Sequence, residues 1–350
     1  MTTFDLDLSK YQLGWSDDVE YAFTPEKGLN ERVVEQISWW KGEPEWMRKL
    51  RMRSLKTFDK KPMAEWFAVN MPDLDFQDIY YYLKPATEQV DEWDDLPEQM
   101  KKTYEKLGIP EAERKYLAGV TSQYDSEVVY HRNRVELEEQ GILFCDMDTA
   151  LREYPDLVKQ YFGTVIPPGD NKFAALNTAF IADGAFIALA PNAVAAEPVH
   201  LLFVSAPGDA VNTAQPRNLI VAGANSSSKI VEHYISLGGA AHFTNTVTEI
   251  SVGEGAHIEH AKFQEENLEA FHIATVQATL ARDSRFLSHS ISTGARLARP
   301  DGTARRLTSL NLPEPPANCR ATLRCPDSES RAPVVPLPHG TTGPARREPD

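Results

Sequence analysis

The histidines are the residues of this sequence whose spacing could bind a metal. Seven of the nine lie in the range 200–289, and imidazole is a common ligand of iron and zinc. Three of them, His233, His260 and His289, each follow an apolar residue by two positions and recur at nearly even intervals. A glutamate directly precedes the first two. The three histidines are therefore candidate iron ligands, stacked in a column with the glutamates.

The same spacing also has a structural explanation. A repeat period of about 20–50 positions indicates stacked repeats, and like residues recur in such repeats because each coil has the same plan. A histidine ladder would then serve packing and hydrogen bonding, and we favour this interpretation over metal binding. His257 and His260 are three apart on a predicted strand, so they face opposite sides and cannot chelate one ion together.

The elements that would position these histidines are short β segments over residues 217–294. Gly, Ser, Asn and Asp separate them, and no long helical pattern interrupts them. Strand-rich units without helices between them predict a parallel β-helix, in which each coil buries its face by stacking on its neighbours. The β character begins at Asn177, with the first turns at Gly184 and Pro191.

A helical region precedes the β-helix. Asn30 comes before a helical pattern that Gly42 and Pro44 divide into two helices. Further helices are predicted within 96–116 and over 149–162, with a strand ending in GILFCD before the last of them. The sequence thus divides into an extended lead-in, a helical (α+β) domain, an incomplete β-helix core and a tail, at residues 1–30, 31–165, 166–299 and 300–350.

The tail has a different composition from the rest. Ten of the 24 prolines fall in 300–350, and no aromatic residue follows Phe286. Such a segment cannot bury enough apolar surface to offset chain entropy, so we predict disorder. Because solenoids cap their open ends, the abrupt change favours a truncated or frameshifted β-helix over a natural tail.

Composition narrows the class of protein. The net charge of -15 argues against nucleic acid and anionic membranes as partners. No apolar run is long enough to span a membrane, and the acidic N-terminus lacks the core of a signal peptide. Three cysteines do not make a disulfide framework. The sequence indicates a soluble cytoplasmic protein with reduced thiols.

The remaining motifs carry weaker signals. Cys145 ends an apolar strand, where a free cysteine is usually an inert hydrophobe, with a sulfur-handling role as the alternative. Cys319 and Cys325 are too far apart for a zinc pair. The run SVGEGAH is not a phosphate-binding loop and predicts a β-turn.

Several stretches resemble the SufB/SufD family, the scaffold proteins of SUF iron–sulfur cluster assembly. GILFCDMDTALREYPDLVKQYFGTVIPPGDNKFAALN and WWKGEPEWMRKLRMRSL look like SufB. LEAFHIATVQATLARDSRFLSHSISTGARLAR looks like SufD, as do NTAFIADGAFIAL and EPVHLLFVS. The resemblance changes near 172–178, so the first half is SufB-like, 178–299 is SufD-like and the tail is unmatched. This pattern is that of a chimera or a divergent fused form.

The resemblance implies a right-handed parallel β-helix flanked by helical domains. It also implies a cytoplasmic scaffold without catalytic residues, which holds an iron–sulfur cluster transiently. Its partners would be a SufC-like ATPase, which hydrolyses ATP, and a second SufB/SufD-like subunit. SufB has a sulfur-accepting cysteine in a strand that reads roughly V-E-G-C. The corresponding stretch here is IVEHYIS, which has His233 and Tyr234 and no thiol. The family's late cluster-site positions would lie beyond Arg299, so none is carried over.

Two other functions remain open. One is a non-functional chimeric or truncated fragment that keeps only the fold. The other is a carbohydrate-active β-helix enzyme, which needs clustered carboxylates or a basic catalytic residue on one external face. Asp is scarce over 210–282 and Glu is scattered, which disfavours the enzyme.

Overall fold

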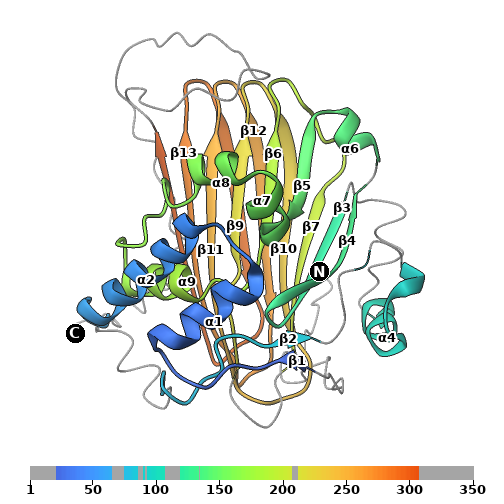
Figure 1. Cartoon of the computed structure of the whole chain (residues 1–350). Coiled ribbons are helices and arrows are strands. Elements are labelled where there is room, and N and C mark those ends of the chain that lie inside the picture. Colours follow the sequence, from blue (N-terminus) through green and yellow to red (C-terminus); the bar gives the residue numbers. More distant parts are fainter. Residues whose placement is uncertain are drawn as a thin grey trace, which may run out of the picture.

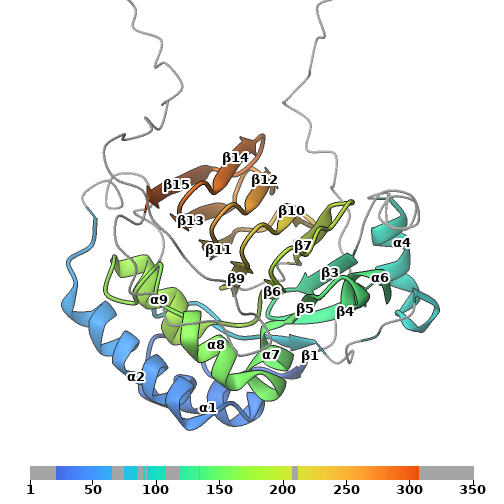
Figure 2. The ribbon, with the colours of Figure 1, turned by 90° about the horizontal axis from the view of Figure 1, so that it is seen from above.

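Two β-sheets face each other and form a solenoid, with helices along the outer side of one sheet (Figure 1, Figure 2). The computed structural model describes residues 21–64, 75–85, 90, 93–106, 119–133, 135–206 and 212–306. The predicted tail beyond residue 306, most of the predicted lead-in, and Cys319 and Cys325 lie outside these ranges.

The strands of the solenoid alternate between the two sheets along the chain. The first sheet, which the helices cover, holds β6 (Ala185–Leu189), β9 (Arg217–Ala222), β11 (His242–Val252), β13 (Phe271–Leu280) and β15 (Leu297–Arg306). The second sheet holds β7 (Val199–Ser205), β10 (Ser227–Ser236), β12 (His257–Glu265) and β14 (Arg285–Ser292). The short strand β8 (Asn212–Ala214) pairs with β11.

Neighbouring strands within each sheet of the solenoid are parallel, which confirms the predicted parallel β-helix. The repeat length varies along the solenoid. One coil takes the chain from Ser227 of β10 to its partner His257 of β12, and the next takes it from His257 to Arg285 of β14. The second of these coils is therefore shorter than the first by two positions, and this variation decides which residues stack.

An apolar ladder fills one half of the space between the sheets, which we call the lumen. Ile187, Ile220 and Ile250 pair in register on the first sheet and are fully buried. Ile230 and Ile258 lie on β10 and β12 of the second sheet and pack in the same cluster. Burying each such side chain contributes roughly 1.5–3 kcal/mol, so this ladder is a main source of coil-to-coil stability.

Tight turns stack along the corner beside the apolar ladder. Asn192, Asn225, Gly255 and Asp283 take positive φ at equivalent places in successive coils. Backbone hydrogen bonds join the turns, with Asn225 N–H donating to Glu254 C=O. Asn and Gly tolerate this left-handed conformation best, which is why these residue types punctuate the sequence.

The helical cover begins as the sequence predicts. Asn30 caps α1 (Glu31–Lys41) by accepting the Val33 N–H, and Gly42 ends it in the left-handed conformation. The helix α2 (Glu45–Lys60) follows. The predicted division of this region into two helices is confirmed.

The helix α9 (Lys172–Phe180) corrects the prediction of β structure from Asn177 onward. Asn171 caps it by accepting the Ala174 N–H. Residues 173–180 are all buried, between the first sheet and α2. A helix that is buried on all sides shows no clear amphipathic period, so the sequence pattern could not reveal it.

Residues before the solenoid also supply strands. β3 (Gly119–Tyr124) pairs in parallel with β7, and β4 (Glu127–Asn133) and β5 (Ile142–Asp146) add antiparallel edges. The chain thus joins the two sheets well before residue 166. At the other end β15 runs beyond residue 299 to Arg306.

The remaining described elements are short. The predicted helix at 149–162 is two helices, α7 (Met147–Glu153) and α8 (Pro155–Tyr161). The others are listed here with their bounds: β1 (Tyr21–Phe23), β2 (Lys84–Pro85), η1 (Trp93–Asp95), α4 (Glu98–Lys106) and α6 (Val135–Glu139).

A buried ion pair attaches the cover to the first sheet. Arg217 of β9 lies 2.6 Å from Glu249 of β11, and both side chains are fully buried. The Glu249 carboxylate also accepts the N–H groups of Gly163, Val165 and Ile166. The segment after α8 is thereby fixed on the sheet.

Candidate functional site

The three candidate histidines do not share a column. His233 pairs with Phe263, three positions after His260, because the coil between them is longer than the spacing of the two histidines. His260 pairs with Ser288, one position before His289. An odd offset reverses the face of a strand residue. His260 therefore points into the lumen, while His233 and His289 lie on the outer face, and the predicted stacking is wrong.

The outer histidines have separate surroundings. His233 Nε2 lies 2.8 Å from the Glu265 carboxylate, and its ring stacks on that of His200 at 5.8 Å between centroids. Burial and then the neighbouring His233 lower the pKa of His200 to about 3. His289 is exposed. Among the described residues no group of three or more His, Cys, Asp or Glu could hold a metal ion, and metal binding by the three histidines stays a prediction.

The lumen of the later coils holds a buried polar cluster, which begins at Glu232 of β10. Its carboxylate accepts hydrogen bonds from Tyr234, Thr248 and Asn218. His260 Nε2 lies 3.2 Å from Glu232 Oε1, outside the geometry of a hydrogen bond. Burial opposes ionisation of Glu232, but His260 and these donors outweigh it and lower the pKa to about 2.

Glu266, which follows β12, is the second buried carboxylate. His272 Nδ1 lies 2.7 Å away, His242 Nε2 lies 3.2 Å away, and Thr244 and Gln264 donate hydrogen bonds. Burial again opposes ionisation, and the two imidazoles outweigh it, so the pKa of Glu266 lies well below its usual value. Burial lowers the pKa of His272, which favours its neutral form.

Lys262 lies between the two carboxylates. Its Nζ is 3.1 Å from His272 Nε2 and 5.9 Å from the centre of the Tyr234 ring. Burial lowers the pKa of Lys262 to about 8, although Glu232 and Glu266 oppose the shift. These contacts define the lumen cluster, which consists of Glu232, Tyr234, His242, His260, Lys262, Glu266 and His272.

The sequence interpretation found only part of this cluster. It named His260 for its spacing, and it noted Glu232 beside His233 as part of the supposed column. Lys262 and Glu266 went unnoticed, although the alternation in HIEHAKFQE, with polar residues at inward positions, was a usable signal. This alternation can be interpreted only when the strand register is known, and the sequence pattern alone predicted the register wrongly.

Cys145 fits the inert interpretation. It lies on β5, pairs with Phe186 and is buried in an apolar cluster. Burial, followed by the neighbouring Asp146, raises the pKa of its thiol far above the usual value. The thiolate, which is the nucleophile and metal ligand, is disfavoured here.

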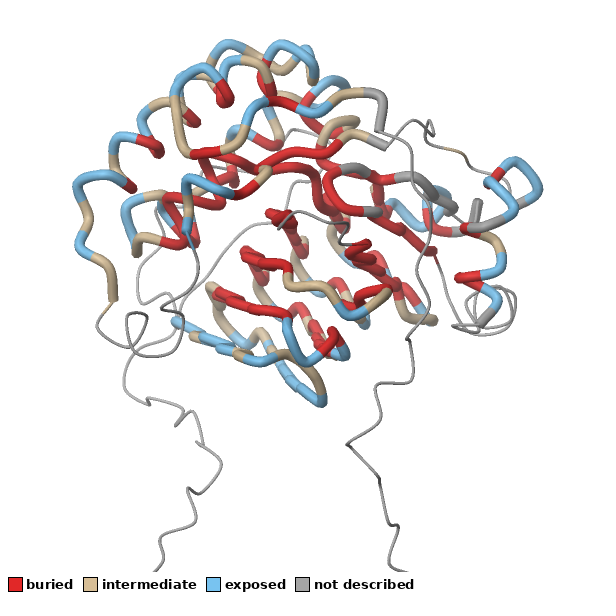
Figure 3. Tube along the Cα trace, turned by 90° about the horizontal axis from the view of Figure 1, so that it is seen from below, coloured by how far each residue is buried: buried red, intermediate tan, exposed pale blue. Residues whose placement is uncertain are grey.

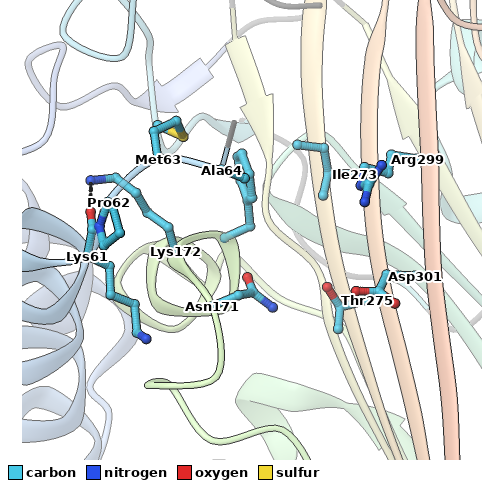
Figure 4. A pocket seen from close by; sticks show the side chains of 11 residues that line it. Lys61, Pro62, Met63, Ala64, Asn171, Lys172, Ile273, Thr275, Arg299 and Asp301 are labelled. Carbon is cyan, nitrogen blue, oxygen red and sulfur yellow. Dashed lines mark hydrogen bonds between the residues drawn. The ribbon is translucent and has the colours of Figure 1, made fainter. Parts of the chain in front are cut away.

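A hollow of about 510 Å³ lies between the end of α2, the start of α9 and the edge of the first sheet (Figure 4). Lys172 does not reach into it freely, because its Nζ donates to the carbonyls of Phe58 and Lys61. Arg299 and Asp301 of β15 line the opposite side with opposite charges. The Lys172 contacts hold the end of α2 against the start of α9.

No helix of the described ranges has the length and hydropathy of a membrane span.

The comparisons with known proteins give a consistent result. Residues 41–201 match the SufBD protein N-terminal region. Residues 203–307 match the SufBD core domain of SUF system FeS cluster assembly.

The curated relatives agree with these matches. An iron–sulfur cluster assembly SufBD family protein of Staphylococcus saprophyticus is 44% identical over 260 residues, which cover 74% of this chain and 55% of the relative. A protein of the same description from Staphylococcus aureus strain MRSA252 is 44% identical over 264 residues, with the same shares. The chain spans just over half the length of these relatives.

Proposed function

The chain belongs to the SufBD family of iron–sulfur cluster assembly proteins, and from this premise we propose that it is a scaffold subunit of a SUF complex. The observation that carries the proposal is the extent of the match. It runs through the helical cover and the solenoid, over 41–201 and 203–307. The chain would act by binding, and ATP hydrolysis would belong to a partner.

The partners proposed are a SufC-like ATPase and a second SufB/SufD-like subunit. The sequence resembles SufB before residue 178 and SufD after it, and this resemblance supports both proposed partners. Iron and sulfide would be the cargo of this assembly, held transiently as a cluster. The same proposal places the chain in the cytoplasm.

The exposed histidines are the residues to test for iron. His289 is open to solvent and His233 is partly so, whereas His260 is buried beside Glu232. If the outer face supplies ligands, His233→Ala combined with His289→Ala should lower iron retention after anaerobic loading. The matched control is His131→Ala, a histidine of β4 outside these strands.

The decisive experiment is coexpression of the full chain with a tagged SufC-like ATPase and a SufB/SufD-like subunit. The scaffold proposal predicts a stable complex that retains iron and sulfide in equal amounts after anaerobic reconstitution. A folded chain that captures neither partner and retains neither element would support the fragment alternative. Release of reducing sugar from polysaccharides would instead support the β-helix enzyme.

Sequencing of the source locus tests a separate part of the proposal. Continuous reads across the codons for 172–178 and 296–350 would establish a fused scaffold as a real gene product. Reads that show separate SufB-like and SufD-like genes, or a restored frame after residue 299, would assign the function to two parent proteins.

A further inference from the structure

Three consecutive strands of the second sheet place an acid, a base and a hydroxyl in line. Glu232 is on β10, His260 on β12 and Ser288 on β14, and the strands are adjacent in this order. His260 Nε2 lies 3.2 Å from Glu232 Oε1, and His260 Nδ1 lies 3.2 Å from Ser288 Oγ. Glu232 and His260 are buried, whereas Ser288 is exposed. Figure 3 shows that the strands at one end of the solenoid are more exposed than those further inside.

One tautomer of His260 suits the surroundings of Glu232. Every other contact to this carboxylate comes from a donor, and its lowered pKa keeps it ionised. That tautomer carries its proton on Nε2, which lies 3.2 Å from Glu232 Oε1. Its Nδ1 is then an acceptor for the Ser288 hydroxyl. A hydroxyl, a base and a carboxylate that orients the base are the parts of an activated serine nucleophile.

The neighbours of Ser288 favour a small, uncharged acyl group. Phe286 lies against the His260 ring, at 6.4 Å between centroids, and forms an apolar wall. On the facing strand β15, the residues in register with the lumen side of β13 are the small Ala298, Pro300 and Gly302. These residues present no bulky side chain toward the end of the lumen.

We propose that Ser288 is a nucleophile that accepts the acyl group of small activated esters. Ser288 Oγ forms a bond to the ester carbonyl carbon while its proton moves to His260 Nδ1. The carbon–oxygen bond to the alcohol then breaks, and the alcohol leaves with the proton from His260. Water hydrolyses the acyl-serine by the reverse proton route, so no oxidant or reductant is needed. Glu232 is a positioning residue, because it acts through His260.

The test uses the full chain, a fluorophosphonate probe and p-nitrophenyl acetate, with the labelled peptide identified by mass spectrometry. Fluorophosphonate is attacked at phosphorus and releases fluoride, so it reports the same nucleophile. We expect one label, on Ser288. Ser288→Ala should remove the label, and His260→Gln should slow it by about 10²–10⁴-fold.

The control is Ser292→Ala, a hydroxyl on the same face of β14 and further along the strand from His260. It should leave labelling unchanged, and circular dichroism should show that all three variants are folded. Labelling of Ser288→Ala at the wild-type rate, labels spread over several serines, or no label on the folded wild-type chain would overturn the proposal. Ser288→Ala should still bind the proposed SUF partners, so the result is independent of the scaffold function.

Discussion

The two halves of the solenoid lumen share one backbone but differ in what holds them together. In the apolar half, Ile220, Ile250 and Ile258 belong to one buried cluster that runs through successive coils. Two positions further along β10 and β12, the polar half begins with Glu232 and His260. The apolar half depends on buried area and tolerates small shape changes. The polar half depends on complete pairing, since one lost partner leaves a buried group unsatisfied.

The largest effect should come from breaking the polar half at Glu232. Glu232→Ala removes the acceptor that Tyr234, Thr248 and Asn218 share, and it removes the carboxylate beside His260. Removing one member of a buried charged network costs roughly 3–5 kcal/mol, and urea unfolding at pH 7 measures it. Glu259→Ala is the control on the same sheet, because Glu259 lies on the outer face and pairs with Lys229 near solvent. Equal midpoints for the two variants would contradict the comparison.

The pH dependence of the stability lost in Glu232→Ala gives a second test of the polar half. The folded pKa of Glu232, about 2, lies below its ordinary value of 4.5. Its contribution is therefore present above pH 4.5 and is lost as the pH falls from 4.5 to 2. The gap between wild type and Glu232→Ala should shrink over that range. A gap that stays constant would show that the carboxylate is not ionised in the folded state.

The apolar half should show a slightly smaller effect without pH dependence. Ile250→Ala removes buried methyl groups between Ile220 and Ala278. Such substitutions cost about 2–5 kcal/mol, and the loss should be the same at pH 4 and pH 8. Ile250→Val, which keeps most of the side chain, should cost about 0.5–1.5 kcal/mol. A strong pH dependence of either variant would show that the two halves are coupled.

Lys262→Met tests the cation of the polar half. The folded pKa of about 8 lies below the ordinary value of 10.5, so the unfolded chain binds more protons between these values. Wild-type stability should therefore rise with pH over this window, by at most about 3 kcal/mol. The variant should lack this rise. A wild-type unfolding curve that is flat over this range would show that the amine is not desolvated as the geometry implies.

The comparison also explains what the sequence could predict. The corner turns and the apolar alternation depend on residue type alone, and these signals yielded the β-helix and the helix boundary at Gly42. The stacking of His233, His260 and His289 depended on turn lengths. The coil lengths differ from the histidine spacings by odd numbers of positions, which moved each histidine to the opposite face from its predecessor.

The wrong assignment at α9 and the unforeseen contacts of Glu249 have related physical causes. The helix α9 is buried on every side, so it lacks the period that identifies surface helices. Glu249 is fixed by Arg217 and by the backbone of residues 163–166, all distant in sequence. Contacts of this range follow from the fold and leave no local pattern. The polar half of the lumen can be predicted from the sequence only when the inward-pointing positions are known.

The smallest effect is expected at the corner beside the apolar half. Gly255 has φ +67, and a Cβ there would clash with the Asn225 side-chain oxygen. Gly255→Ala should cost about 1–2 kcal/mol through the left-handed conformation, with a small further cost as Asn225 moves. Gly302→Ala, where a Cβ meets nothing within 4 Å, is the control. Because backbone strain does not titrate, the Gly255→Ala loss should be equal at pH 4 and pH 8. An unaffected midpoint would show that coil stacking in the apolar half does not depend on the turn conformation.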